Sequence, residues 1–127
     1  MKTSSTAALA MLVGIGVGAL GVHALRAQTR PPVYMIGVVD VSNPDGYAKE
    51  YLPPAQTSIK AHGGVTIAAG PGTVIEGTPP GNRFVILRWD SLEQLKGWRN
   101  SPEYMTAHEA GMKYAKFTVV AVDGAKQ

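Results

Sequence analysis

The segment Arg83–Tyr104 constrains the fold of this 127-residue chain more than any other part of the sequence. It begins with Arg83–Trp89, an apolar run that is typical of a β-strand. Ser91 and Gln94 then match a capping box, in which each side chain satisfies a free backbone donor at the start of a helix. Ser101-Pro102 begins a further helix, since serine caps a helix and proline suits its first position. The segment therefore predicts a strand followed by two capped helices.

The other segments predict a similar alternation of strands and helices. Val33–Val41 is rich in β-branched and aromatic residues, as strands are. Asn43-Pro44 begins a helix, and Pro53-Pro54 predicts a kink or a restart within it, because proline lacks a backbone donor. The apolar face of this helix repeats every four residues, at Tyr47, Tyr51, Ala55 and Ile59. Two more strands are expected at Val65–Ala69 and Lys116–Asp123, with Thr73–Glu76 as a candidate extension of the former.

This order, β-α-β-β-α-β, predicts an α+β domain of the ferredoxin-like class, with an antiparallel four-stranded sheet and helices on one face. Val33–Val39 and Phe84–Leu87 are apolar at odd and even positions alike. Because strands alternate faces, both faces of the sheet should be buried, yet the helices cover only one of them. A second copy of the chain is the simplest cover for the other face. We therefore expect a homodimer in which two sheets form a dimeric α/β barrel.

The first 27 residues predict export. Ala7–Val22 is apolar and uncharged after a start that carries Lys2, and small-residue cleavage sites end at Ala24 and Ala27. The alternative is an uncleaved anchor, since a membrane-spanning helix needs about 20 apolar residues. We expect residues 1–27 to be a signal peptide or anchor, 28–32 a linker, 33–124 the domain and 125–127 a tail. The expected location is the periplasm or the medium, with no membrane contact beyond the possible anchor.

Composition excludes several classes of site. The chain has no cysteine, which removes disulfides, thiol nucleophiles and thiolate metal centres. Its formal charge of +3 includes Lys2 and Arg26 of the export segment, and no basic stripe indicates nucleic acid. His62, His108 and Glu76 lack the spacing of a metal site, so neither a metal nor a cofactor is expected.

Short segments along most of the chain are typical of one protein family. They are Tyr34 with Val38–Asp40, Pro44–Tyr51, Gly63-Gly64, Glu76-Gly77, Trp98, Ser101–Tyr104 and Val119–Gly124. With these segments the chain resembles domain-of-unknown-function family 1330, whose members are small dimeric α/β-barrel proteins. The resemblance implies the fold but no agreed activity, although relatives by fold include cofactor-independent quinone-forming monooxygenases, isomerases and haem-handling enzymes. Val65 and Gly111 stand where the family often has a basic residue and an arginine.

Three side chains are candidates for catalysis. His108 titrates near neutral pH and is a candidate acid or base, with Tyr104 on the same helix face as a hydrogen-bond donor. Glu76, in a Glu-Gly pair, is a candidate base. Each also has a structural explanation, because His108 suits a half-exposed helix position and Glu76 can accept backbone donors in a turn.

Four more side chains are candidates for lining a ligand pocket between sheet and helices: Trp98, Tyr34, Tyr51 and Arg88. Trp98 follows leucines at helical spacing, so packing against the sheet also explains it. Two classes of function remain open. One is a small-molecule site, with or without cofactor-free oxidation or isomerisation of an aromatic or carbonyl compound. The other is a non-catalytic exported protein that binds a ligand or another protein.

Overall fold

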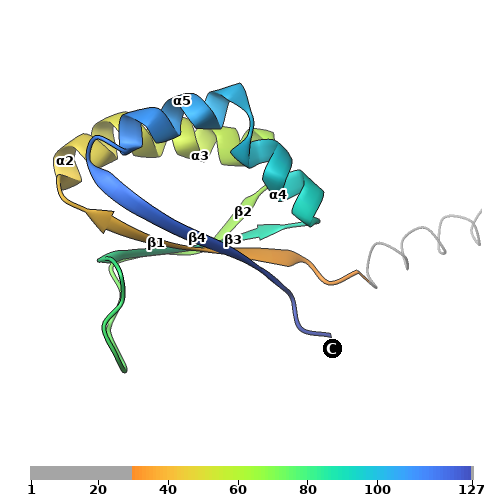
Figure 1. Ribbon diagram of the computed structural model, residues 1–127. Coiled ribbons are helices and arrows are strands. Elements are labelled where there is room, and N and C mark those ends of the chain that lie inside the picture. Colours follow the sequence, from red (N-terminus) through yellow and green to blue (C-terminus); the bar gives the residue numbers. More distant parts are fainter. Residues whose placement is uncertain (1–29, 127) are drawn as a thin grey trace, which may run out of the picture. The chain divides into compact units, whose positions relative to one another are not determined.

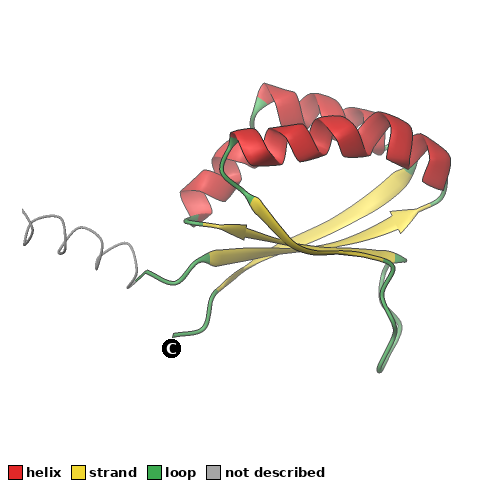
Figure 2. Ribbon diagram, turned by 180° about the vertical axis from the view of Figure 1, so that it is seen from behind, coloured by secondary structure: helices red, strands yellow, loops and turns green. Residues whose placement is uncertain are grey.

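The computed structural model describes residues 30–126. The expected signal peptide or anchor therefore lies outside the described residues, as does the start of the linker. A sheet forms one layer and the helices form a second layer on one of its faces (Figure 1, Figure 2). Within residues 30–126 no helix has the length and apolar character that crossing a membrane requires.

The described elements follow the predicted order. The strands are β1 (Val33–Val41), β2 (Val65–Gly70), β3 (Arg83–Trp89) and β4 (Ala115–Asp123). The helices are α2 (Pro44–Gly46), the π-helix η1 (Tyr47–Tyr51), α3 (Leu52–Ala61), α4 (Leu92–Arg99) and α5 (Pro102–Gly111). The strands pair in the order β2-β3-β1-β4, and the pairs are antiparallel. The predicted ferredoxin-like α+β fold is thereby confirmed.

The register of the sheet decides which side chains can meet. Met35 pairs with Leu87 on β3 and with Ala121 on β4, and these odd-numbered residues face the helices. Tyr34 pairs with Arg88 and with Val122, and these even-numbered residues lie on the helix-free face.

Proline explains an irregularity in the first helical run. The amide of Leu52 bonds the carbonyl of Tyr47, five residues back, so the helix widens into a π segment before α3 begins. Pro53 and Pro54 follow at once and supply no backbone donor, which makes the wider turn the favourable way to continue. The predicted kink or restart is therefore realised as a π segment that keeps Tyr47 and Tyr51 on the buried face.

Side-chain caps begin the later helices as the sequence predicts. Ser91 Oγ accepts from the amide of Gln94 at 3.1 Å, and Ser101 Oγ accepts from the amide of Tyr104 at 3.3 Å. In a capping box the Gln94 side chain accepts from the amide of Ser91. Here Gln94 Oε1 accepts instead from the amide of Asp90, one residue earlier, at 2.7 Å. These caps fix the start of α5 and with it the position of Tyr104.

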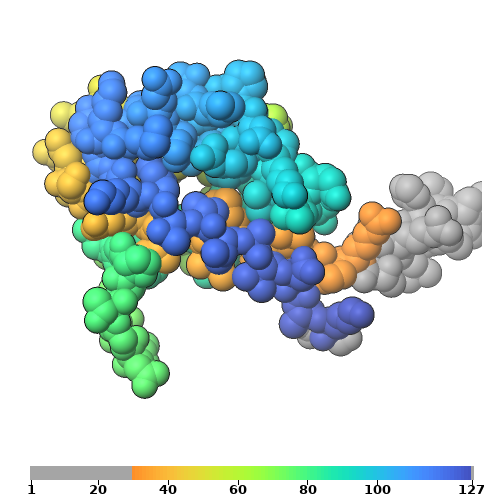
Figure 3. Space-filling model, viewed as in Figure 1, coloured from red at the N-terminus to blue at the C-terminus, as the bar shows by residue number. Residues whose placement is uncertain are grey.

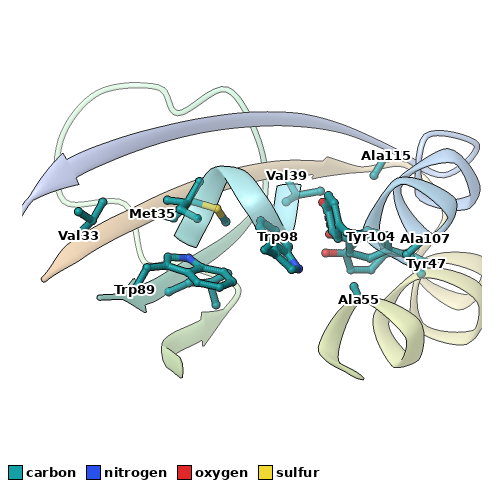
Figure 4. Close-up of a cluster of buried hydrophobic side chains, with 13 residues drawn as sticks. Val33, Met35, Val39, Tyr47, Ala55, Trp89, Trp98, Tyr104, Ala107 and Ala115 are labelled. Atoms are coloured by element: carbon teal, nitrogen blue, oxygen red, sulfur yellow. Dashed lines mark hydrogen bonds between the residues drawn. The ribbon is translucent and has the colours of Figure 1, made fainter. Parts of the chain in front are cut away.

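The core lies between the helix layer and the odd-numbered face of the sheet (Figure 4). Trp89, Trp98 and Leu87 are each 1% exposed. The rings of Trp89 and Trp98 lie 5.1 Å apart, so the tryptophans of β3 and α4 join sheet to helix.

The segment 71–82 between β2 and β3 is an arm that leaves the body of the domain (Figure 1). Thr73–Glu76, the candidate strand extension, forms no strand within the described chain. Ile75, near the middle of this segment in the sequence, is 92% exposed.

Candidate functional site

Two adjoining cavities lie between the helices and the sheet. An inner cavity of about 70 Å³ is lined by residues of all four strands and of η1, α3, α4 and α5, and it has room for about two water molecules. An outer cavity of about 360 Å³ reaches the surface as a hollow beside β4 (Figure 3). The outer cavity is lined by Met35, Trp98, Arg99, Tyr104, His108, Phe117 and Val119. Its volume lies in the range of small-molecule sites.

Aromatic rings form much of the wall of the outer cavity. The ring centroids of Trp98 and Tyr104 lie 4.0 Å apart, and Figure 4 shows these two side chains next to each other. The His108 ring lies 5.8 Å from that of Tyr104 and 4.9 Å from that of Phe117. The wall therefore offers flat apolar surfaces to a planar guest, with one imidazole among them.

Hydrogen bonds hold two of these rings in place from behind. Tyr51 and Tyr104 share a hydrogen bond of 2.8 Å between their hydroxyl oxygens. Trp98 Nε1 donates to Ser58 Oγ at 3.0 Å, and this hydroxyl donates in turn to the carbonyl of Ala55 at 2.7 Å. Both aromatic groups are thus satisfied within the protein and give the cavity a fixed shape.

Arg99 supplies a positive charge at the edge of the outer cavity. Its Cζ lies 5.3 Å from the centre of the Tyr104 ring, a cation–π contact. Within residues 30–126 the one ion pair joins His62 to Glu103, so no carboxylate balances the Arg99 guanidinium there. The last turn of α4 interacts favourably with this cation, which gives it a structural role as well.

Burial and the nearby cation set the charge state of the site. Burial lowers the pKa of His108, and the guanidinium of Arg99 lowers it further. Burial raises the pKa of Tyr104 and of Tyr51. At neutral pH the imidazole is therefore uncharged and able to accept a proton, while both phenols keep theirs.

Four predicted residues meet at these cavities. Trp98 and Tyr104 line both cavities, Tyr51 lines the inner one and His108 lines the outer one. The structure thus places a candidate base, a candidate donor and two aromatic walls in one region.

The other three predicted residues lie elsewhere. Tyr34 and Arg88 are register partners on the helix-free face, so they do not line the hollow that contains His108. The reason is strand alternation, since each is one residue away from a helix-facing position. Glu76 lies exposed in the arm, next to Val74 and Gly77 and away from the outer cavity of its own chain.

The sequence did not indicate Arg99 or Arg83, which line the outer and the inner cavity, because an arginine at the end of a helix or strand is usually solvated. The available signal for Arg99 was its position directly after Trp98, which the leucine spacing already directs toward the sheet. Gly111 stands where the resemblance implies an arginine. A Cβ at position 111 would lie 2.5 Å from Tyr51 Cδ1 and 3.0 Å from Phe117 Cζ, so two rings fill that space.

The remaining histidine pairs outside the cavity. His62 Nε2 lies 3.5 Å from Glu103 Oε2 at the surface. The described residues hold no group of three His, Asp or Glu side chains that is arranged for a metal ion.

This geometry defines a class of protein: a ferredoxin-like α+β domain with an aromatic cavity beneath its helices. Residues 32–125 match the family described as Domain of unknown function (DUF1330), and the chain belongs to that family. Comparison with curated proteins gives no match.

Solved structures of similar fold have low sequence identity to this chain. A protein of unknown function from Rhodopseudomonas palustris is 17% identical with a TM-score of 0.59, over 77% of this chain and 85% of that one. SnoaB, a cofactor-independent oxygenase from Streptomyces nogalater, is 11% identical with a TM-score of 0.54, over 76% and 95%. A dimeric ferredoxin-like protein of unknown function from Thermobifida fusca is 10% identical with a TM-score of 0.50, over 74% and 92%. These likenesses show the fold alone.

Proposed function

We propose that this protein binds a small planar anion, an aromatic or conjugated carbonyl compound, in the outer cavity. The observation that carries this proposal is the Arg99 guanidinium, which lies beside an aromatic wall without a carboxylate partner in residues 30–126. A guanidinium pairs well with a carboxylate or an enolate oxygen, and the rings of Trp98 and Phe117 suit a flat apolar body.

His108 supports a second step after binding. Its lowered pKa leaves it unprotonated at neutral pH and able to accept a proton from a carbon next to a carbonyl group. Return of that proton to another carbon of the conjugated system gives an isomer. Alternatively, the deprotonated compound reacts with O₂, so that a CH₂ group becomes a carbonyl and one water is released. Tyr104 would donate a hydrogen bond to the anion, although its hydroxyl is already shared with Tyr51.

The working unit in this proposal is an exported homodimer. The similarity to a dimeric ferredoxin-like protein and the exposed apolar side chains of the helix-free face support the dimer. The apolar segment Ala7–Val22 with its cleavage sites supports export to the periplasm or the medium. The intact mass of the protein recovered from cell fractions tests both the location and the cleavage after Ala24 or Ala27.

A fluorescence titration tests the binding site, because Trp98 lines the cavity. We expect 2-naphthoate to quench tryptophan emission, and its neutral analogue 2-naphthamide to bind at least about tenfold more weakly. Arg99→Gln should remove this preference for the anion. Lys96→Gln, which removes an exposed cation from the same helix, is the matched control and should keep it. Equal binding of both compounds, unaffected by Arg99→Gln, would contradict an anion site.

The alternative function is binding without turnover, and a substitution of His108 distinguishes it from catalysis. His108→Gln should leave the affinity for 2-naphthoate within about threefold, because glutamine keeps a polar group at the wall. If His108 is a base, the variant loses proton exchange at the acidic carbon of a bound carbonyl compound, which NMR in D₂O measures. If neither protein catalyses this exchange, the protein is a binding protein.

A further inference from the structure

The arm 71–82 extends to the helix-free side of the sheet. Two views half a turn apart show it descending from the end of the sheet where β3 begins, away from the helices (Figure 1, Figure 2). The arm carries Val74, 58% exposed, and Ile75, 92% exposed. Two neighbouring apolar side chains on a projecting arm are unfavourable in water unless another surface covers them.

The base of the arm is fixed rather than loose. Asn82 Oδ1 accepts from the amide of Val41 at 2.9 Å, and Asn82 Nδ2 donates to the carbonyl of the same residue at 3.1 Å. A Cβ on Gly81 would lie 2.7 Å from the Val39 backbone, and one on Gly72 would lie 2.6 Å from the Phe84 ring. The two ends of the arm therefore pack tightly on β1 and β3, and these contacts set its direction.

The helix-free face, like the arm, exposes apolar side chains to water. Ile36, Val120 and Val122 are 37%, 52% and 47% exposed, so the arm does not cover them within one chain. Arg88 lies exposed on this face, and it forms no ion pair within residues 30–126. Glu76, next to Ile75 in the arm, likewise has no cationic partner there.

We propose that the arm packs on a second copy of this chain, where Glu76 pairs with Arg88 of that copy and Ile75 covers part of its apolar face. This inference rests on the homodimer proposed above. A two-fold axis relates the two copies, so the arm of each copy covers part of the helix-free face of the other.

The ends of the sheet decide where the arm tip contacts the second copy. In the proposed arrangement the two-fold axis places the two arms at opposite ends of the packed sheets. Each tip then reaches the end of the second sheet that is opposite to that sheet's own arm. That end carries Arg88, Tyr34 and Val122, which are cross-strand neighbours in the register. The three predicted site residues that lie outside the hollow, Glu76, Tyr34 and Arg88, thus share one contact between copies.

Charge exchange tests the pair by sedimentation equilibrium. Glu76→Arg and Arg88→Glu should each raise the Kd of the dimer about tenfold or more, because each places like charges together. The double variant Glu76→Arg/Arg88→Glu should return the Kd to within about threefold of the starting value. Glu93→Arg, an exposed reversal on α4, is the control and should leave the Kd unchanged.

The outcomes separate the arm from the dimer itself. Val120→Glu changes the middle of the helix-free face and should dissociate the dimer regardless of the arm. If Val120→Glu dissociates it while both arm-pair reversals have no effect, the dimer stands and the arm contact is wrong. If the unmodified protein is a monomer, the proposed dimer and the arm contact are both wrong. All of these side chains are exposed, and circular dichroism checks that each variant folds.

Discussion

The hydroxyl oxygen of Tyr51 lies 2.8 Å from that of Tyr104, and this buried contact joins the first helical run to α5 at the wall of the cavity. Both rings are almost fully buried, at 8% and 3% exposure. Because burial raises the pKa of both groups, the contact is a neutral hydrogen bond at any working pH. One hydroxyl donates to the other, and the second hydroxyl keeps its own hydrogen available.

This pair predicts a non-additive double-mutant cycle. Tyr51→Phe should lower the free energy of unfolding by about 1–2 kcal/mol, because it leaves the Tyr104 hydroxyl buried without its partner. Tyr104→Phe should act similarly, while the double variant should cost less than the sum of the two. Urea unfolding of the four proteins measures the coupling, and additive costs would show that the hydroxyls do not interact.

Replacing either buried tryptophan by phenylalanine should lower the free energy of unfolding, but by different amounts. Trp98 Nε1 donates to Ser58 Oγ, whereas Trp89 Nε1 is buried without a hydrogen-bond partner in residues 30–126. Trp98→Phe should therefore destabilise the protein about 1 kcal/mol more than Trp89→Phe, since only the former breaks a hydrogen bond. Chemical denaturation of both variants provides the comparison. An equal or larger cost for Trp89→Phe would contradict this reading of the core.

Much of the fold was predictable because its signals are local. Capping residues, the four-residue repeat of the first helix and the β-branched runs placed the helices and strands, and the order of these elements predicted their arrangement. The π segment was not predictable in detail, since Pro53 and Pro54 are equally compatible with a kink. Thr73–Glu76 has the composition of a strand, which explains the expected extension. It forms no strand because it has no neighbouring strand to pair with inside one chain.

Two glycines predict opposite effects of the same substitution. Gly97 lies in α4 with open space around its Cα, so Gly97→Ala should stabilise the protein by about 0.5–1 kcal/mol through helix propensity. Gly111→Ala should destabilise it by about 1–3 kcal/mol, because the added methyl group would collide with the Tyr51 and Phe117 rings. Thermal unfolding of the two variants gives the signs. Stabilisation by Gly111→Ala would mean that the rings move aside freely.

His108 predicts a pH dependence of stability with a definite sign. Its pKa in the folded protein is lowered from the ordinary value of 6.5 by burial and by Arg99, so the unfolded chain binds the proton more tightly. The associated stability is fully present above pH 6.5 and is lost as pH falls through the folded pKa. The free energy of unfolding should therefore fall more steeply between about pH 7 and pH 5 in the unmodified protein than in His108→Gln. Identical slopes would place His108 in a fully solvated position.

The candidate site was only partly predictable, for a geometric reason. Tyr104 and His108 share a helix face at a spacing of four residues, which sequence periodicity reveals directly. Tyr34 and Arg88 depend on which face of a strand points to the helices, and a strand that is apolar on both faces conceals that choice. Arg99 depends on how the end of α4 lies against α5, which is a tertiary relationship without a local signal.

A crystal structure of the protein grown with 2-naphthoate decides whether the outer cavity is an anion site. We expect a ligand in the outer cavity, with its carboxylate about 3 Å from the Arg99 guanidinium and its rings against Trp98 and Phe117. We also expect the helix-free faces of two copies to be in contact. A cavity closed by its own side chains, with the helix-free face open to water, would show that both proposals are wrong.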